Sequence, residues 1–310
     1  MIINYLRRKS TRNEYIIAYR AVGEEQTLLK NNVPSSYKVI QATDRWWYAD
    51  PLLFTDKESV YCFMEAYDRK KDIGRIAVSE YKNGGFTDPL VILEENFHLS
   101  FPFVFSKNGN VYMIPETSSI GEIRIYKAEN SLYNWKLVKT IDCEGAVDTC
   151  LWNYDDKDYL ITSIIGEPAV YTKEKILVLD DLFNVYECNN IFDDVMEGYG
   201  ARNGGRIIEL EGQCYLPKQV SLPPDKYGIY LDGYVLSNSE NGIVRTKTAK
   251  IETNVIQIDN YPINYQKLGV HTYDYKSGVE VVDLNINTIR LINLFREARN
   301  EIKRRFRGIK

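Results

Sequence analysis

Residues 47–54, WYADPLLF, join a short polar motif to an apolar strand, and the chain repeats this arrangement four more times. The later copies are HLSFPFVF around Ser100, AVDTCLWNY around Asp148, GARNGGRII around Asn203 and GVHTYDY around His271. The copies follow at intervals of roughly fifty residues, with a longer last interval, and this period of short strands is typical of propeller blades. The sequence therefore predicts an all-β, five-bladed β-propeller.

A second strand with its own polar residue follows each motif. In the first four copies this residue is Glu65, Glu116, Ser163 or Lys218, and the weaker strand VEVVDL follows the fifth. Residues 14–20 precede the first motif, so we expect them to add a strand to the last blade and close the ring. The first strand of each blade lines the central axis, so the motif residues should meet at one mouth of the channel.

Composition fits a single soluble domain, since 310 residues with 44% hydrophobic content can fill one large all-β core. The net charge of −4 offers no basic surface for nucleic acid, which we do not expect as a partner. The five cysteines include no C-x-x-C pair and predict neither a disulfide framework nor a zinc site. We find no signal peptide or membrane span in the sequence and expect a cytoplasmic protein.

The last residues differ in character from the rest. From Asn287 onward apolar residues recur at helical spacing among many Arg and Lys residues, which predicts a basic amphipathic helix over 287–310 after a propeller over 1–286. This helix could pack on the propeller. It could instead bind an anionic membrane surface, or a membrane-bound assembly enzyme, and hold the protein at the inner face of the membrane.

The predicted axis carries a mixed acidic and basic set of side chains, which indicates a polar site. The motifs and second strands supply the candidates: Trp47, Asp50, Glu65, His98, Ser100, Glu116, Asp148, Arg202, Asn203, Lys218 and His271.

The wording and order of several segments resemble a known family. RWWYADPLLF, FHLSFPFVF, GNVYMIPET, VDT and HTYDY occur in that order over residues 14–285, and this stretch resembles the N-terminal domain of glucosamine inositolphosphorylceramide transferase. The resemblance implies a five-bladed propeller similar to the family 43 glycoside hydrolases. It also implies a carbohydrate-active protein of surface-polysaccharide or glycolipid assembly.

Glycosidic chemistry usually needs one ionised and one protonated carboxyl group. In the hydrolase-like propellers the first-blade Asp of an A-D-P motif acts as base, so the resemblance assigns Asp50 this role, and His271 resembles the channel histidine of their last blade. We propose Glu116 as the acid, because apolar neighbours could raise its pKa, and Asp148 as a carboxylate that tunes or orients the others. The sequence departs from the hydrolases at Ser100, where they carry Asp, and their acid comes from the third blade.

Each candidate also has a structural interpretation. Asp50 could cap backbone N–H groups, Glu116 could pair with Arg124 or Lys127, and His271 could be a hydrogen-bonded interior residue. Arg202 and Lys218 could bind a carboxylated or phosphorylated sugar, or could neutralise Asp50 and Asp148. Glu65, His98, Ser100 and Asn203 complete the predicted binding residues.

Three functions remain open from the sequence. The protein could transfer or hydrolyse a glycosyl unit from a sugar or nucleotide-sugar ligand. It could bind a glycan without catalysis, with Trp46, Trp47, Tyr48 and Phe101 stacking on sugar rings. It could also be a membrane-associated scaffold for a glycosyltransferase. No cofactor is predicted, although a divalent metal in the channel stays open.

Overall fold

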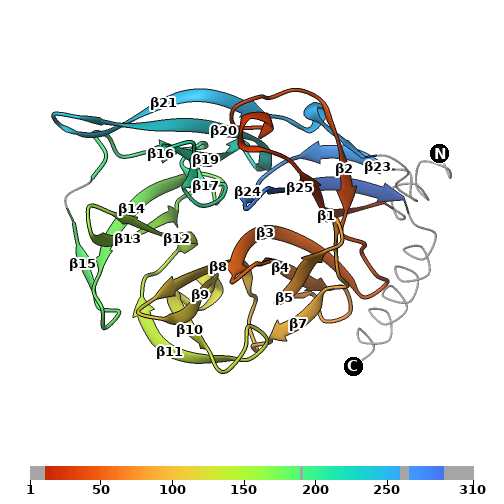
Figure 1. Ribbon diagram of the computed structural model, residues 1–310, viewed down its shortest axis with the longest axis horizontal. Coiled ribbons are helices and arrows are strands. Elements are labelled where there is room, and N and C mark those ends of the chain that lie inside the picture. Colours follow the sequence, from red (N-terminus) through yellow and green to blue (C-terminus); the bar gives the residue numbers. More distant parts are fainter. Residues whose placement is uncertain (1–10, 189–190, 259–264, 290–310) are drawn as a thin grey trace, which may run out of the picture.

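The computed structural model describes residues 11–188, 191–258 and 265–289. In this part of the chain five sheets are arranged around a central axis (Figure 1), and their strand pairs are antiparallel except for the parallel pair of β2 and β22. The helical elements are three short 3-10 turns, η1 (Glu24–Gln26), η2 (Ser118–Ile120) and η3 (Thr253–Val255). The predicted all-β, five-bladed propeller is confirmed.

The five blades take their strands almost in chain order. Blade I contains β3 (Trp46–Asp56), β4 (Ser59–Asp68), β5 (Ile73–Lys82), β6 (Gly85–Phe86) and β7 (Leu90–Leu93). Blade II contains β8 (Ser100–Lys107), β9 (Asn110–Glu116), β10 (Glu122–Ala128) and β11 (Trp135–Asp142). Blade III contains β12 (Ala146–Tyr154), β13 (Lys157–Ile165), β14 (Thr172–Leu179), β15 (Val185–Glu187) and β16 (Glu197–Gly198). Blade IV contains β17 (Arg202–Asn203), β18 (Ile208–Leu210), β19 (Gln213–Leu222), β20 (Lys226–Ser239) and β21 (Gly242–Ile251).

Blade V joins the two ends of the described chain. Its strands are β1 (Thr11–Ala21), β2 (Ser35–Val39), β22 (Ile256–Ile258), β23 (Tyr265–Gly269), β24 (Tyr273–Lys276) and β25 (Val279–Ile289). β1 pairs antiparallel with β25 along its whole length, which confirms that residues 14–20 close the ring. β25 includes residues 287–289, where the sequence predicted the start of a helix, because these residues pair with β1 and β23 instead. The rest of that predicted helix lies outside the described residues.

The hydrophobic core is divided among the seams between blades. Four of the five clusters of buried side chains draw on two neighbouring blades, for example Phe63 of blade I with Met113 of blade II, and Ile161 of blade III with Leu216 of blade IV. The fifth combines blades II and III with Leu52 of blade I. Alternation along the strands directs one set of side chains to each neighbouring blade. This packing holds the inner strands β3, β8, β12, β17 and β24 around the axis.

The inner strands of three blades share one backbone irregularity. The register between first and second strands shifts after Ala49, Ser100 and Val147, and the next residue in each case has a positive φ: 50° at Asp50, 42° at Phe101 and 50° at Asp148. Such bulges re-aim side chains and are common beside functional sites. Position by position, Asp50 therefore corresponds to Phe101 and Asp148, while Ser100 corresponds to Ala49. The sequence alignment of the second motif was wrong by one residue.

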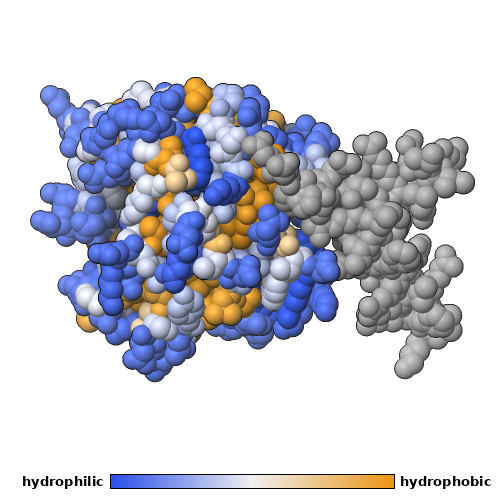
Figure 2. All heavy atoms as spheres, turned by 45° about the vertical axis from the view of Figure 1, so that its right-hand side comes forward, coloured by the Kyte–Doolittle hydropathy of each residue, from blue (hydrophilic) through white to orange (hydrophobic). Residues whose placement is uncertain are grey.

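The surface of the propeller is mostly hydrophilic on the face shown in Figure 2. Figure 2 shows hydrophilic side chains over most of one face, with apolar side chains in separate areas between them. Among the described residues, no helix has the length and apolar character needed to cross a membrane.

Candidate functional site

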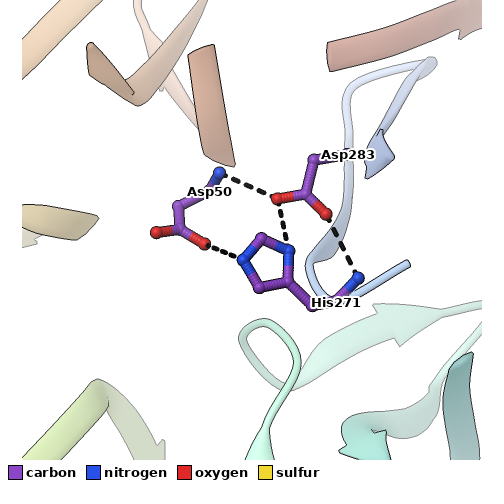
Figure 3. Close-up of side chains that lie close together, drawn as sticks. All are labelled: Asp50, His271 and Asp283. Carbon is purple, nitrogen blue, oxygen red and sulfur yellow. Dashed lines mark hydrogen bonds and ion pairs between the residues drawn. The ribbon is translucent and has the colours of Figure 1, made fainter. Parts of the chain in front are cut away.

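Asp50 lies at the centre of a cluster formed by blades I and V. Its Oδ1 accepts a hydrogen bond from the Thr272 hydroxyl at 2.9 Å, and its Oδ2 accepts from the backbone N–H of Phe101 at 3.2 Å. His271 Nε2 lies 3.3 Å from Asp50 Oδ1, and His271 Nδ1 lies 2.7 Å from Oδ2 of Asp283 (Figure 3). We call Asp50, His271 and Asp283 the histidine cluster.

Asp283 fixes the backbone around this cluster as well as the imidazole. Its Oδ1 accepts the N–H groups of His271 and Thr272 at 3.2 and 2.9 Å, and its Oδ2 accepts the N–H of Asp50 at 3.0 Å. Burial alone would lower the pKa of His271, but Asp283 and Asp50 raise it to about 9. Burial raises the pKa of Asp50, and the imidazolium opposes this rise. The cluster therefore holds a protonated histidine between two carboxyl groups.

The side chains of the histidine cluster lie close enough together to hold a metal ion, since one possible ligand atom from each residue lies within 4.8 Å of the others. Metal binding needs an unprotonated imidazole nitrogen. Here both nitrogens face carboxylates and the pKa is raised to about 9, so the group carries its own positive charge. The donor set as arranged fits an ion-paired triad, and we derive no step through a metal.

A second cluster, formed by blades II, III and IV, contains a permanent cation. Arg202 Nε donates to Asp148 Oδ2, and its terminal NH2 group donates to Asp148 Oδ1 at 3.3 Å and to Glu116 Oε2 at 3.1 Å. Burial raises the pKa of Asp148 to about 7, although the Arg202 charge opposes the rise. We call Glu116, Asp148 and Arg202 the arginine cluster. Glu116 thus pairs with Arg202, not with Arg124 or Lys127.

Tyr227, at the start of β20, connects the two clusters. The guanidinium carbon of Arg202 lies 5.0 Å from its ring centroid, and the His271 ring lies 5.4 Å away in an edge-on arrangement. The charges of Asp148 and Asp50 both act on Tyr227, and that of Asp148 acts on His271. The clusters therefore belong to one site near the propeller axis, which we call the mouth.

Aromatic rings continue from the mouth in an unbroken series. His271 stacks on Tyr15 at 4.5 Å, Tyr15 contacts Trp47 at 5.5 Å, Trp47 stacks on Tyr67 at 4.4 Å, and Tyr67 lies 6.2 Å from His98. Trp47, Tyr67 and His98 keep part of their surface exposed. By contrast, Tyr48 and Phe101 are 3% and 1% exposed and lie in the interblade cores, so they do not offer a face to a sugar.

The structure also shows what surrounds the remaining predicted binding residues. Lys218 is fully buried and donates to Glu174 Oε1 and Asn203 Oδ1, both at 2.8 Å. Asn203 donates in turn to the backbone carbonyls of Asp148 and Ile161. These two residues hold blade IV against blade III, and Lys218 pairs with Glu174 and does not neutralise Asp50 or Asp148. Ser100 is buried opposite Glu116.

Glu65 occupies the same position as Glu116, one blade earlier. Glu65 lies opposite Ala49 and Glu116 opposite Ser100, on the second strand of each blade, as the repeat predicted. Glu65 Oε1 lies 3.3 Å from His98 Nε2.

Sequence reasoning missed Asp283, Tyr15 and Tyr227. Asp283 sits within the segment VEVVDL, which the sequence identified only as a weak second strand, and a carboxylate between two apolar residues of an inward strand was the available signal. Tyr15 and Tyr227 gave no comparable signal, since the chain has 24 tyrosines.

A comparison with known protein families shows to which family the chain belongs. Residues 32–238 match the family described as glucosamine inositolphosphorylceramide transferase 1, N-terminal. The chain belongs to this family. Its members include the glucosamine inositolphosphorylceramide transferase 1 of Arabidopsis thaliana, 32% identical over 179 residues, which are 54% of this chain and 23% of that protein. The protein of the same name from Oryza sativa subsp. japonica is 29% identical over 178 residues, 55% of this chain and 24% of that one.

The chain thus matches about a quarter of the length of these relatives. Among solved structures, the catalytic domain of the Coprinopsis cinerea GH62 α-L-arabinofuranosidase is similar, with a TM-score of 0.56 at 10% identity over 87% of this chain and 97% of that one. A family 117 glycoside hydrolase produced by Zobellia galactanivorans has a TM-score of 0.51 at 9% identity, over 88% of this chain and 90% of that one. At such identities the likeness shows the fold alone.

Proposed function

We propose that this protein makes or breaks a glycosidic bond at the mouth of the propeller, by transfer or by hydrolysis. The observation that carries the proposal is the coexistence of Asp50, whose negative charge is stabilised by His271, with the buried carboxyl groups of Asp148 and Glu65, whose pKa values are raised by burial. Glycosidic chemistry needs this combination. Asp50 would be the base that takes the proton of the attacking water or sugar hydroxyl, and Glu65, Glu116 and Asp148 are the candidate acids.

The charge of the mouth favours an uncharged glycoside as ligand. Among the described residues there, Arg202 and His271 are the cationic groups, and each already faces two carboxyl groups. A nucleotide-sugar diphosphate would meet an excess of negative charge, which costs binding energy. We therefore place the nucleotide-sugar ligand second.

A noncatalytic glycan-binding function is the alternative, and the exposed part of the ring series from Tyr15 to His98 favours it. Aromatic faces bind sugar rings with little loss of conformational entropy. From the sequence we also retain the proposals of a cytoplasmic location and of a basic C-terminal segment that binds an anionic membrane surface or an assembly enzyme.

A thermal-shift panel followed by product analysis tests the proposed function. Neutral oligosaccharides and aryl glycosides should raise the melting temperature and be converted, because a ligand that binds only the folded state stabilises it. A shift without conversion would favour the binding function. A shift with nucleotide sugars alone would contradict the ligand class, and no shift with any sugar would favour a scaffold.

A further inference from the structure

Glu65, Glu116 and Asp148 are the carboxyl groups at the mouth that could supply the proton. They differ in their hydrogen-bond partners. Arg202 donates to both oxygens of Asp148 and to Oε2 of Glu116, while the Ser118 hydroxyl donates to Oε1 of Glu116 at 2.8 Å. Protonating either group would give up a charge-assisted bond with a guanidinium that stays charged at all relevant pH values. Although burial raises the pKa of Asp148, both groups are bonded to Arg202, which leaves Glu65 as the carboxyl group of the three without a cationic partner.

Glu65 has no such partner. It is 5% exposed, and its buried Oε1 makes no hydrogen bond of good geometry with any described residue. The titratable groups that act on it are His98 ahead of β8, Asp50 on β3, Glu116 on β9, Asp283 on β25 and Tyr15 on β1. Arg75 lies opposite Ala66 on the other face of the blade and pairs with Glu94. Burial first, and then the three neighbouring carboxylates, raise the pKa of Glu65 well above its usual range.

His98 is the neighbour of Glu65 on the side of blade II. The N–H of Gly74 donates to His98 Nδ1 at 3.0 Å, so in the neutral imidazole the hydrogen is on Nε2, 3.3 Å from Glu65 Oε1. Burial lowers the pKa of His98, which keeps the ring neutral. The imidazole beside Oε1 is therefore neutral and adds no positive charge that would favour the ionised form of Glu65.

Gly74 is what allows this approach. A Cβ at position 74 would lie 2.6 Å from Glu65 Oε1, 2.8 Å from His98 Cε1 and 2.4 Å from the Leu99 carbonyl oxygen. Only glycine leaves room for the backbone N–H to reach the imidazole. The contact between Glu65 and His98 is thus built into the backbone of blades I and II.

We propose that Glu65, oriented by His98, is the proton donor of the mouth and that it acts opposite Asp50. This inference rests on the proposed function. As the bond between the anomeric carbon and the glycosidic oxygen breaks, the carboxyl proton of Glu65 passes to that oxygen and the alcohol leaves. A water or sugar hydroxyl attacks the anomeric carbon and gives its proton to Asp50. Solvent then returns the proton to Glu65 and removes the one on Asp50.

The test compares Glu65→Gln with Glu116→Gln, the matched change one blade later. Gln has the shape of a protonated Glu but cannot give up a proton. On methyl glycosides or oligosaccharides, whose leaving groups need protonation, kcat/KM of E65Q should fall by about 10²–10⁴-fold. On 2,4-dinitrophenyl glycosides, whose leaving group does not, the loss should be much smaller. Equal losses on both substrate types, or this pattern in E116Q instead, would overturn the assignment.

A second readout does not depend on activity. The folded pKa of Glu65 is raised, so the wild-type protein loses stability as pH rises above the unfolded value of 4.5, and E65Q does not. The melting temperature of E65Q relative to wild type should therefore rise as the pH increases above about 4.5. A pH-independent difference would overturn the protonated state of Glu65. If the wild type converts no glycoside at all, the proposed function fails, while this readout still decides the state of Glu65.

His98 is a positioning residue in this account, and its test uses rescue. His98→Ala should lower kcat on methyl glycosides, and His98→Gln, which keeps a neutral polar side chain beside Glu65, should restore most of it. Equal activity of the two variants would contradict the role of His98.

Discussion

The two clusters at the mouth contain similar acids and different cations. In the histidine cluster, Asp50 and Asp283 face an imidazolium that can lose its proton, whereas in the arginine cluster Asp148 and Glu116 face a guanidinium that cannot. The same second-strand position also holds Glu116 bonded to Arg202 and Glu65 beside a neutral His98. One side of the mouth holds a cation that can lose its proton, and the other holds a cation whose charge is permanent.

The largest effect on this comparison should come from Arg202→Met. Without the guanidinium, Asp148 and Glu116 would remain side by side without a cation, and breaking a buried pair in this way costs about 3–5 kcal/mol of unfolding free energy. Denaturant unfolding measures it. Lys250→Met, which breaks an exposed pair with Glu252, is the matched control and should cost much less. Equal losses would mean that the arginine cluster is not a stabilising unit.

The pH dependence of Asp148→Asn tests the arginine cluster next. The folded pKa of about 7 lies above the unfolded value of 3.8, so Asp148 contributes stability fully below about pH 4 and loses it as pH rises through about 7. The unfolding free energy of D148N relative to wild type should therefore increase between pH 4 and pH 7. Unfolding at a series of pH values checks this, and a flat difference would contradict the raised pKa.

His271→Gln should act in a different pH window. The folded pKa of about 9 lies above the unfolded value of 6.5, so the protonated imidazole stabilises the fold below about pH 6.5, and this contribution is lost as pH rises through about 9. The advantage of wild type over H271Q should shrink between these values. An advantage that stays constant would mean that His271 is neutral in the folded protein.

The smallest effect should come from Tyr227→Phe. The contacts that connect the clusters are made by the Tyr227 ring, so removal of the hydroxyl should change stability by no more than about 0.5 kcal/mol. Tyr227→Ala removes the ring and should cost clearly more in the same thermal unfolding experiment. If the two variants are equivalent, the ring does not connect the clusters.

The sequence predicted much of this architecture because the repeat is local. Turn residues, strand alternation and an inward polar residue recur in each blade, so the five blades, the ring closure by residues 14–20 and the pairing of Glu65 and Glu116 with their first strands followed from the pattern. The sequence placed the bulge of blade II one residue too early, at Ser100. The residue with the positive φ is Phe101, and nothing in the sequence shows which of the two neighbours takes this conformation.

The partners of the site residues could not be predicted in the same way. Whether Arg202 faces Asp148, Asp50 or a ligand depends on the angle between blades and on the length of the side chains. The spacing of residues in the sequence does not determine this angle. Asp283 belongs to a strand whose short interval from His271 departs from the other repeats, and Tyr15 reaches the mouth only because β1 closes the ring.

The most direct test of the account is to measure binding and conversion of one glycoside by wild type and Asp50→Asn. The account predicts that the wild type converts the glycoside and that D50N binds it with similar affinity but turns it over about 10²–10⁴-fold more slowly, as expected for loss of a general base. Equal turnover by D50N would contradict the claim that the mouth is the catalytic site.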